Sequence, residues 1–89
     1  MATPKVALVT GSGKQRIGWY VAQALADRGY ALAIHYHTSA AEAQQTVADF
    51  QARGVAALAL QADLTYALAV EAMIGKALAQ FGQLDVLVN

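Results

Sequence analysis

The most constraining feature of this chain is an alternation of short apolar runs with longer helical patterns. Each run has the length and apolar content of a buried strand, and each longer pattern repeats apolar residues at i, i+3 or i+4. Strands that are apolar on both faces and joined by helices form parallel sheets covered on both sides. The expected strands are 5–10, 31–36, 55–61 and 84–88, and the expected helices lie between them.

Start and stop signals bound the expected helices. The second begins with a Ser-Ala-Ala-Glu stretch in capping-box spacing, which predicts that the Ser39 hydroxyl accepts from the Glu42 amide while Glu42 reaches back. Thr65 is the expected N-cap of the third helix. The helices are expected to begin near Ile17, Ser39 and Thr65 and to end at Gly29, Gly54 and Gly82. The expected buried faces are Ala43, Val47 and Phe50 on the second helix and Val70, Met73, Ile74, Ala77, Leu78 and Phe81 on the third.

The order β-α-β-α-β-α-β predicts an α/β fold, an incomplete Rossmann-type doubly wound parallel sheet. With the strand order 3-2-1-4, the first two helices share one face of the sheet and the third lies alone on the other. The fourth strand is then an open apolar edge, which is a structural liability. We therefore expect residues 1–89 to be the N-terminal, dinucleotide-binding half of a single domain whose remainder lies outside them.

The composition excludes several classes of protein. Hydrophobic residues make up 57% of the chain and charged residues 13%, which excludes a disordered segment. The net charge is zero, so neither a nucleic-acid nor a membrane partner is expected. The absence of cysteine excludes disulfides and thiolate chemistry, and with no signal peptide or membrane-spanning stretch a cytoplasmic setting is expected. So few charges in a small chain fit either an obligate oligomer or the beginning of a longer domain.

The stretch between the first strand and the first helix reads TGSGKQRIG, residues 10–18. It matches neither a triphosphate P-loop nor a strict G-x-G-x-x-G. It still meets the physical needs of a dinucleotide, because Gly11 allows a sharp turn after a strand and Gly18 allows close approach in the first helical turn. The helix N-terminus offers unpaired amides to a phosphate. The alternative is a glycine-rich connection that binds no ligand.

The same loop resembles the T-G-x-x-x-G-x-G loop of the short-chain dehydrogenase/reductase family, with one extra residue and Arg16 where a middle glycine often stands. Three further segments fall at the family's spacing, Gly29-Tyr30, Ala62-Asp63-Leu64 and the run LDVLVN at 84–89. The resemblance implies an oxidoreductase, a homo-oligomer (dimer or tetramer), that passes hydride between a nicotinamide and a C=O or C=N bond. It also implies a Tyr-x-x-x-Lys pair, which these residues lack, so no catalytic residue is expected among them.

Two segments are most similar to the pteridine reductase branch of that family. They are the KQRIG part of the loop and HYHTSAAEA at 35–43, where the branch has KRxG and HYHxSAAEA. The branch reduces pterins with NADPH. A 3-oxoacyl-reductase-like member and a non-catalytic dinucleotide-binding or regulatory module are the alternatives, so the substrate is either a small carbonyl compound or a pterin.

The segment after the second strand favours NADP over NAD. NAD-selective sites place a carboxylate there to bind the ribose hydroxyls, but 35–39 contains none. A 2′-phosphate would instead meet Lys14, Arg16, His37, Thr38 and Ser39. Two cations and a helix N-terminus suit a dianionic phosphate. The branch often carries arginine in place of Thr38, and the inserted loop residue leaves open whether Lys14 or Arg16 reaches the phosphate.

The resemblance implies three further cofactor contacts. Asp63 would bond the adenine amino group, the alternative being that it merely caps a turn; Leu64 would pack nearby, and Asn89 would line the cofactor trough. His35 and His37 are only two potential ligands, so no metal site is expected. The complete expected cofactor-binding set is Gly11, Lys14, Arg16, Ile17, Gly18, His37, Thr38, Ser39, Asp63, Leu64 and Asn89.

Overall fold

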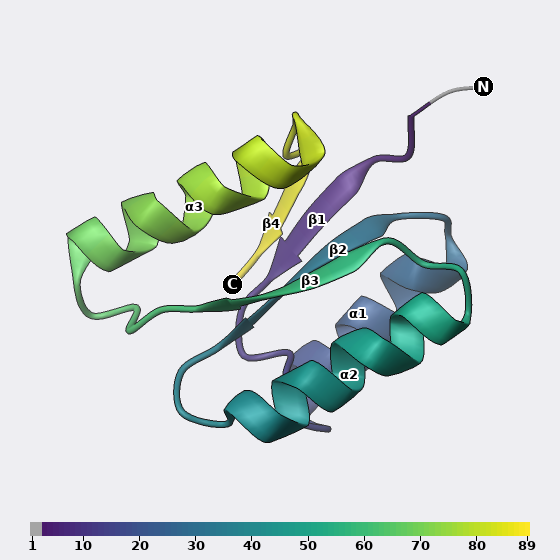
Figure 1. Ribbon diagram of the computed structural model, residues 1–89, viewed down its shortest axis with the longest axis horizontal. Helices are drawn as coiled ribbons and strands as arrows, with labels where there is room; N and C mark the ends of the chain where they lie inside the picture. Colours follow the sequence, from purple (N-terminus) through teal and green to yellow (C-terminus); the bar gives the residue numbers. More distant parts are fainter. Residues whose placement is uncertain (1–2) are drawn as a thin grey trace.

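The protein, as a computed structural model that describes residues 3–89, contains one four-stranded parallel sheet. The strand order is β3-β2-β1-β4, so the Rossmann-type arrangement expected from the sequence is confirmed (Figure 1). The elements in chain order are β1 (Val6–Val9), α1 (Ile17–Asp27), β2 (Ala31–Tyr36), α2 (Ala40–Ala52), β3 (Ala57–Gln61), α3 (Ala67–Phe81) and β4 (Val86–Val88).

Three strands are shorter than the apolar runs that predict them. β3 begins at Ala57 because the Val55 amide bonds the Phe50 carbonyl and so belongs to the turn that ends α2. β4 begins at Val86, which pairs with Ala7. Before it, Asp85 is bonded to Val6 twice: its carboxylate accepts from the Val6 amide at 2.8 Å, and its own amide donates to the Val6 carbonyl at 2.9 Å.

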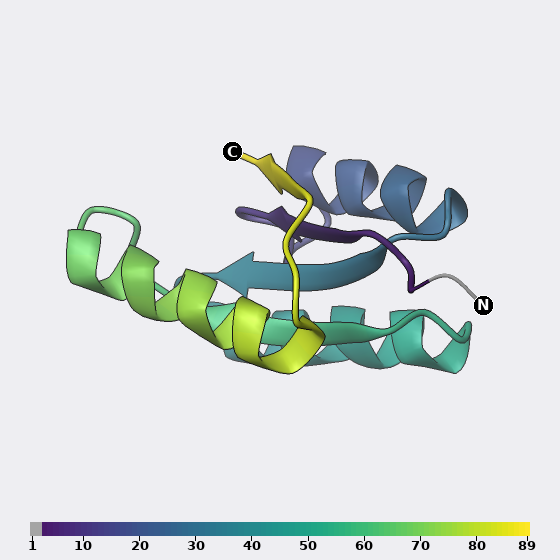
Figure 2. The same ribbon diagram turned by 90° about the horizontal axis from the view of Figure 1, so that it is seen from above.

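The helices cover the sheet unequally, as the strand order requires. α1 and α2 pack on one face (Figure 1), α1 over β1 and β2 and α2 over β2 and β3, as the view from above shows (Figure 2). α3 lies on the opposite face (Figure 1). The buried core under α1 and α2 includes Val9, Ala22, Leu32, Ile34, Val47 and Phe50, and the core under α3 comprises Leu8, Ala33, Leu60, Ala62, Met73 and Ala77.

The glycine signals for the helix ends are confirmed, but both predictions of side-chain caps are wrong. The glycines that follow α1, α2 and α3 all have positive φ. Ser39 precedes α2 with φ −100° and ψ 61°, away from the extended conformation in which an N-cap side chain reaches the first-turn amides, and it forms no side-chain cap. Tyr66, not Thr65, is the N-cap residue of α3, because Thr65 turns back to bond Asp63.

The predicted apolar stripe of α3 is buried only in part. Met73 and Ala77 are buried, and Val70, Ile74 and Phe81 pack against them half-buried. Leu78 is 44% exposed, so its predicted burial is wrong. α3 is the one helix on its face among residues 3–89, and it does not cover the sheet fully. No helix within these residues is long and apolar enough to cross a bilayer.

Candidate functional site

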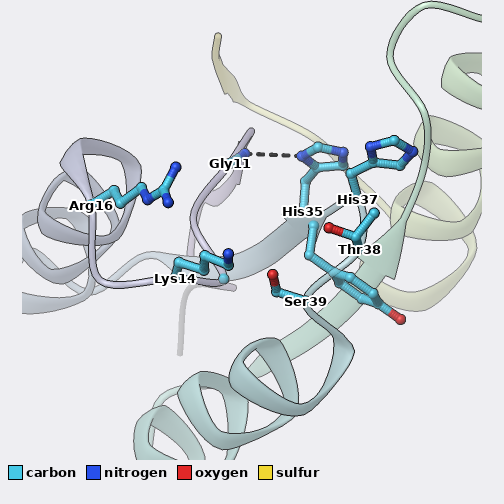
Figure 3. A pocket seen from close by; sticks show the side chains of 9 residues that line it. Gly11, Lys14, Arg16, His35, His37, Thr38 and Ser39 are labelled. Carbon is cyan, nitrogen blue, oxygen red and sulfur yellow. Dashed lines mark hydrogen bonds between the residues drawn. The ribbon is translucent and has the colours of Figure 1, made fainter.

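A polar pocket lies where the chain leaves β1 and β2, at the carboxyl ends of two neighbouring parallel strands (Figure 3). This edge of an open α/β sheet is where ligands bind in such folds. The lining residues are Gly11, Gly13, Lys14, Arg16, His35, Tyr36, His37, Thr38 and Ser39. Six of these belong to the set predicted from the sequence, namely Gly11, Lys14, Arg16, His37, Thr38 and Ser39. Two separate segments of the chain, 11–16 and 35–39, are thus brought into one site.

Gly11 and Gly18 shape the loop as the sequence predicts. Gly11 has φ +61°, the left-handed conformation that turns the chain sharply after β1. At Gly18, a Cβ atom would lie 2.8 Å from the Thr10 carbonyl oxygen and 2.9 Å from that of Gly11. Only glycine therefore lets the first turn of α1 lie against the loop.

Gly13, which the sequence analysis did not assign to the site, lies close against α2 and β2. Its Cβ position lies 3.0 Å from the Ala43 Cβ and 3.2 Å from the Tyr36 Cβ, so a side chain here would displace α2 or β2. Its carbonyl accepts a buried hydrogen bond from the Thr46 hydroxyl at 2.8 Å. The loop is thus held against α2; the signal in the sequence was the glycine at position 13, between Gly11 and Gly18.

His35, considered in the sequence only as half of a metal pair, is a buried part of the loop's support. Its Nδ1 accepts from the Gly11 amide at 2.9 Å, and its Nε2 lies 2.8 Å from the Ala62 carbonyl oxygen. Both ring nitrogens are engaged, so His35 is no metal ligand. Among residues 3–89, no three histidine, cysteine or acidic side chains gather in a way that could hold a metal ion.

The two loop cations take different places. In Figure 3, Lys14 extends from the loop on the side of Ser39, whereas Arg16 lies apart beside the start of α1. Lys14 is half-buried and Arg16 is exposed. Since the Ser39 hydroxyl makes no cap, it remains available beside the amides at the start of α2. This arrangement can bind an anion between the loop and α2.

Asp63 follows the carboxyl end of β3, beside the polar pocket. Its side chain caps a turn, which the sequence analysis gave as the alternative to an adenine contact. One carboxylate oxygen accepts from the Thr65 hydroxyl at 2.6 Å and from the Thr65 amide at 2.9 Å. The other lies 3.6 Å from His37 Nε2. The hydroxyl bond, then the amide bond and the charge of His37 hold the pKa of Asp63 below its ordinary value. The carboxylate is therefore ionised at neutral pH.

The remaining predicted residues lie outside the polar pocket. Leu64 and Asn89 line a second, apolar hollow between β4 and α3, where Asn89 Oδ1 accepts from the Thr10 hydroxyl at 3.3 Å. Ile17 begins α1 with an exposed side chain. The other residues of the hollow are Thr10, Val70, Met73, Ile74 and Leu87. Of the predicted set, six residues thus line the polar pocket, Leu64 and Asn89 line the second hollow, and Ile17, Gly18 and Asp63 line neither.

The comparisons with known proteins agree with this fold. The family model described as short chain dehydrogenase matches residues 5–89. A 3-oxoacyl-(acyl-carrier-protein) reductase of Staphylococcus aureus is 44% identical over 89 residues, which is 100% of this chain and 36% of the relative. A hydroxynaphthalene reductase of Aspergillus fumigatus is 47% identical over 85 residues, 96% of this chain and 31% of the relative.

Among solved structures, a short chain dehydrogenase from Burkholderia cenocepacia in complex with NADP superimposes with a TM-score of 0.90 at 44% identity. The match covers 96% of this chain and 34% of that one. The chain thus spans about a third of the length of the proteins it matches.

Proposed function

Because the chain belongs to the short-chain dehydrogenase family, we propose that residues 1–89 are the dinucleotide-binding first part of a longer single domain, an NADP(H)-dependent oxidoreductase. The observation that carries the choice of cofactor is the polar pocket at the ends of β1 and β2. None of its lining residues, all within 3–89, is acidic, and two, Lys14 and Arg16, are basic.

Electrostatics favours a 2′-phosphorylated nucleotide in this pocket. A carboxylate after β2 would bind the ribose hydroxyls of NAD and repel an added phosphate. Here Thr38 and Ser39 offer hydroxyls instead, and Lys14 lies on their side of the loop. Lys14 is accordingly the partner of the 2′-phosphate in this proposal. Arg16, beside the start of α1, faces the pyrophosphate, where Gly11, Gly18 and the helix amides also act.

The other end of the adenosine would rest on β3. The Asp63 oxygen that faces His37 is not used by the Thr65 turn, so it is the acceptor for the adenine amino group. Leu64 and Asn89 belong to the adjoining hollow, which the cofactor would enter beyond the pyrophosphate. When bound, NADP(H) supplies the hydride, and the residues described here bind and orient it; the groups that move the proton lie outside 1–89 in this proposal.

Two substrate classes follow from different observations. The relationship to the 3-oxoacyl-(acyl-carrier-protein) reductase favours a 3-oxoacyl thioester. The HYHTSAAEA segment favours a pterin, as its resemblance to pteridine reductases implies. Purified complete protein assayed for NADPH oxidation with acetoacetyl-coenzyme A and with a dihydropterin separates them. Tight nucleotide binding with no turnover of any carbonyl or pterin would instead favour the non-catalytic, regulatory alternative.

The cofactor assignment is tested by titrating the complete protein with NADPH and with NADH. The wild type should bind NADPH more tightly, since a phosphate adds charge-assisted hydrogen bonds of about 1.5–3 kcal/mol each, roughly ten- to a hundredfold. Lys14→Ala should remove most of that preference and leave NADH binding nearly unchanged. Arg16→Ala is the matched control, which should weaken both nucleotides together. Equal wild-type affinity for the two nucleotides would overturn the assignment.

Homo-oligomeric assembly and a cytoplasmic setting belong to the same proposal. Sedimentation of the complete protein should give a dimer or tetramer, and fractionation of cells should recover it with the cytoplasmic proteins. A monomer, or recovery with membranes, would contradict these two parts without affecting the cofactor.

A further inference from the structure

A buried histidine joins the two loops that would hold opposite ends of the adenosine. His35 is the fifth residue of β2 and is 4% exposed. Its backbone carbonyl accepts from the Ser12 amide at 3.1 Å, and its Nδ1 accepts from the Gly11 amide at 2.9 Å (Figure 3). Its Nε2 bonds the carbonyl of Ala62, the residue before Asp63.

These partners determine the state of the ring. The Gly11 amide is a donor, so Nδ1 must carry a lone pair and no proton. The Ala62 carbonyl is an acceptor, so Nε2 must carry the hydrogen. His35 is therefore a neutral imidazole in its Nε2–H form, satisfied on both sides. With both nitrogens bonded and the ring buried, it can neither touch substrate nor exchange a proton with it.

We propose that His35 is a positioning residue that sets the distance between the phosphate loop after β1 and the Asp63 turn after β3; this inference rests on the proposed function. The imidazole spans the two loops as a rigid ring, with one hydrogen bond at each end. No side chain with a single polar group could hold both. The ring thereby couples the part of the site that meets phosphate to the part that meets adenine.

Two substitutions cut the two bonds separately. In His35→Asn, the amide oxygen can take the place of Nδ1 and keep the Gly11 bond, but nothing reaches Ala62. In His35→Gln, the longer side chain can replace Nε2 at Ala62 and leaves the Gly11 amide without its partner. Each variant should weaken NADPH binding by about five- to tenfold, the effect of one hydrogen bond of about 1 kcal/mol.

The decisive measurement is a crossed pair of double-mutant cycles on NADPH affinity in the complete protein. His35→Asn frees the β3 end, so it should shrink the effect of Asp63→Ala at least threefold and leave that of Lys14→Ala unchanged. His35→Gln frees the loop end and should do the reverse. A histidine that only fills the core would give additive effects in all four combinations. Additive cycles would overturn the inference while leaving the proposed function intact.

The unmodified protein provides a second test that does not depend on the variants folding. Nitrogen-15 NMR of labelled histidine should show His35 as the neutral Nε2–H form, with a coupling across the hydrogen bond from Nδ1 to the Gly11 amide. A ring protonated on Nδ1 would overturn the inference. Failure of the wild type to bind either NADPH or NADH would overturn the proposed function first, and this inference with it.

Discussion

The two sides of the sheet differ in how much apolar surface they bury. Under α1 and α2 the core is closed, with Phe50, Ile34 and Val9 at 0% exposure. On the side of α3 and β4, Leu68 and Leu87 stay 79% and 54% exposed. The phosphate loop is fastened to the closed side through Gly13 and Gly18. The pocket proposed for the nucleotide phosphates is therefore built on the face of the sheet that α1 and α2 bury.

The largest expected effect contrasts the two sides directly. Phe50→Ala should lower the free energy of unfolding by about 3–5 kcal/mol, because it empties a fully buried site. Leu68→Ala, at a position of α3 that is exposed within residues 3–89, should have a smaller effect, and its size measures how far the rest of the domain covers this side. Urea denaturation of the complete protein measures both. A large effect at Leu68 would mean that further structure covers this side.

Two glycine-to-alanine substitutions should differ in sign. Gly18→Ala places a Cβ atom against two backbone oxygens and should cost about 1–3 kcal/mol, with weaker nucleotide binding. Gly75→Ala lies in α3 with nothing near its Cβ position and should stabilise by about 0.5–1 kcal/mol. Thermal unfolding and NADPH titration report the two effects. If Gly18→Ala kept full stability and binding, the close approach of loop and helix would not matter.

The bond that fastens the loop to α2 should have an intermediate effect. Thr46→Val keeps the shape of the side chain and leaves the Gly13 carbonyl without its buried donor, at a cost of about 1–3 kcal/mol. Thr46→Ser keeps the hydroxyl and serves as the control. Hydrogen exchange of the loop amides should quicken in the valine variant and stay near wild type in the serine variant. Equal exchange rates in the two variants would mean that the Thr46 bond does not hold the loop to α2.

The smallest effect concerns the turn on the open side. The lowered pKa of Asp63 means that its carboxylate stabilises the fold above its unfolded-state pKa, near pH 4, and that this stabilisation is lost as the pH falls through the lowered value. Thr65→Val removes the hydroxyl bond and should raise the pKa of Asp63 toward its ordinary value. Carbon-13 NMR of the carboxyl group measures the change. His37→Gln removes only the weaker electrostatic effect of His37. If the pKa of Asp63 rose more in this variant than in Thr65→Val, His37 and not Thr65 would be the main cause of the lowered pKa.

The sequence predicted the parts of this molecule that depend on neighbours along the chain. The spacing of apolar residues located all seven elements, and the glycine signals located the helix ends. Leu78 follows the same periodicity as Met73 and yet is exposed, because periodicity says which face of a helix is apolar but not how far the sheet extends beneath it. The predicted cap at Ser39 is also absent. The capping-box spacing does not determine the backbone angles of Ser39, which follow from the path of the chain between β2 and α2.

The support of the site could not be predicted, because it depends on distant partners. The His35 ring meets residues 24 and 27 positions away in the chain, and Thr46 meets a carbonyl 33 positions away. No local pattern marks such pairs. In the sequence, His35 is simply a histidine in a strand. Only the strand order, which places β2 between the loops after β1 and β3, shows that its side chain connects them.

The close approach of Gly13 to Ala43 limits how this loop can be exchanged with the loop of another protein. Residues 10–18 and the first two turns of α2 touch so closely that neither can be replaced alone. A loop transplanted to alter cofactor preference would need a glycine at position 13, a small residue at 43 and a hydroxyl at 46. A graft that kept only the charges of Lys14 and Arg16 would present them from a loop with no anchor.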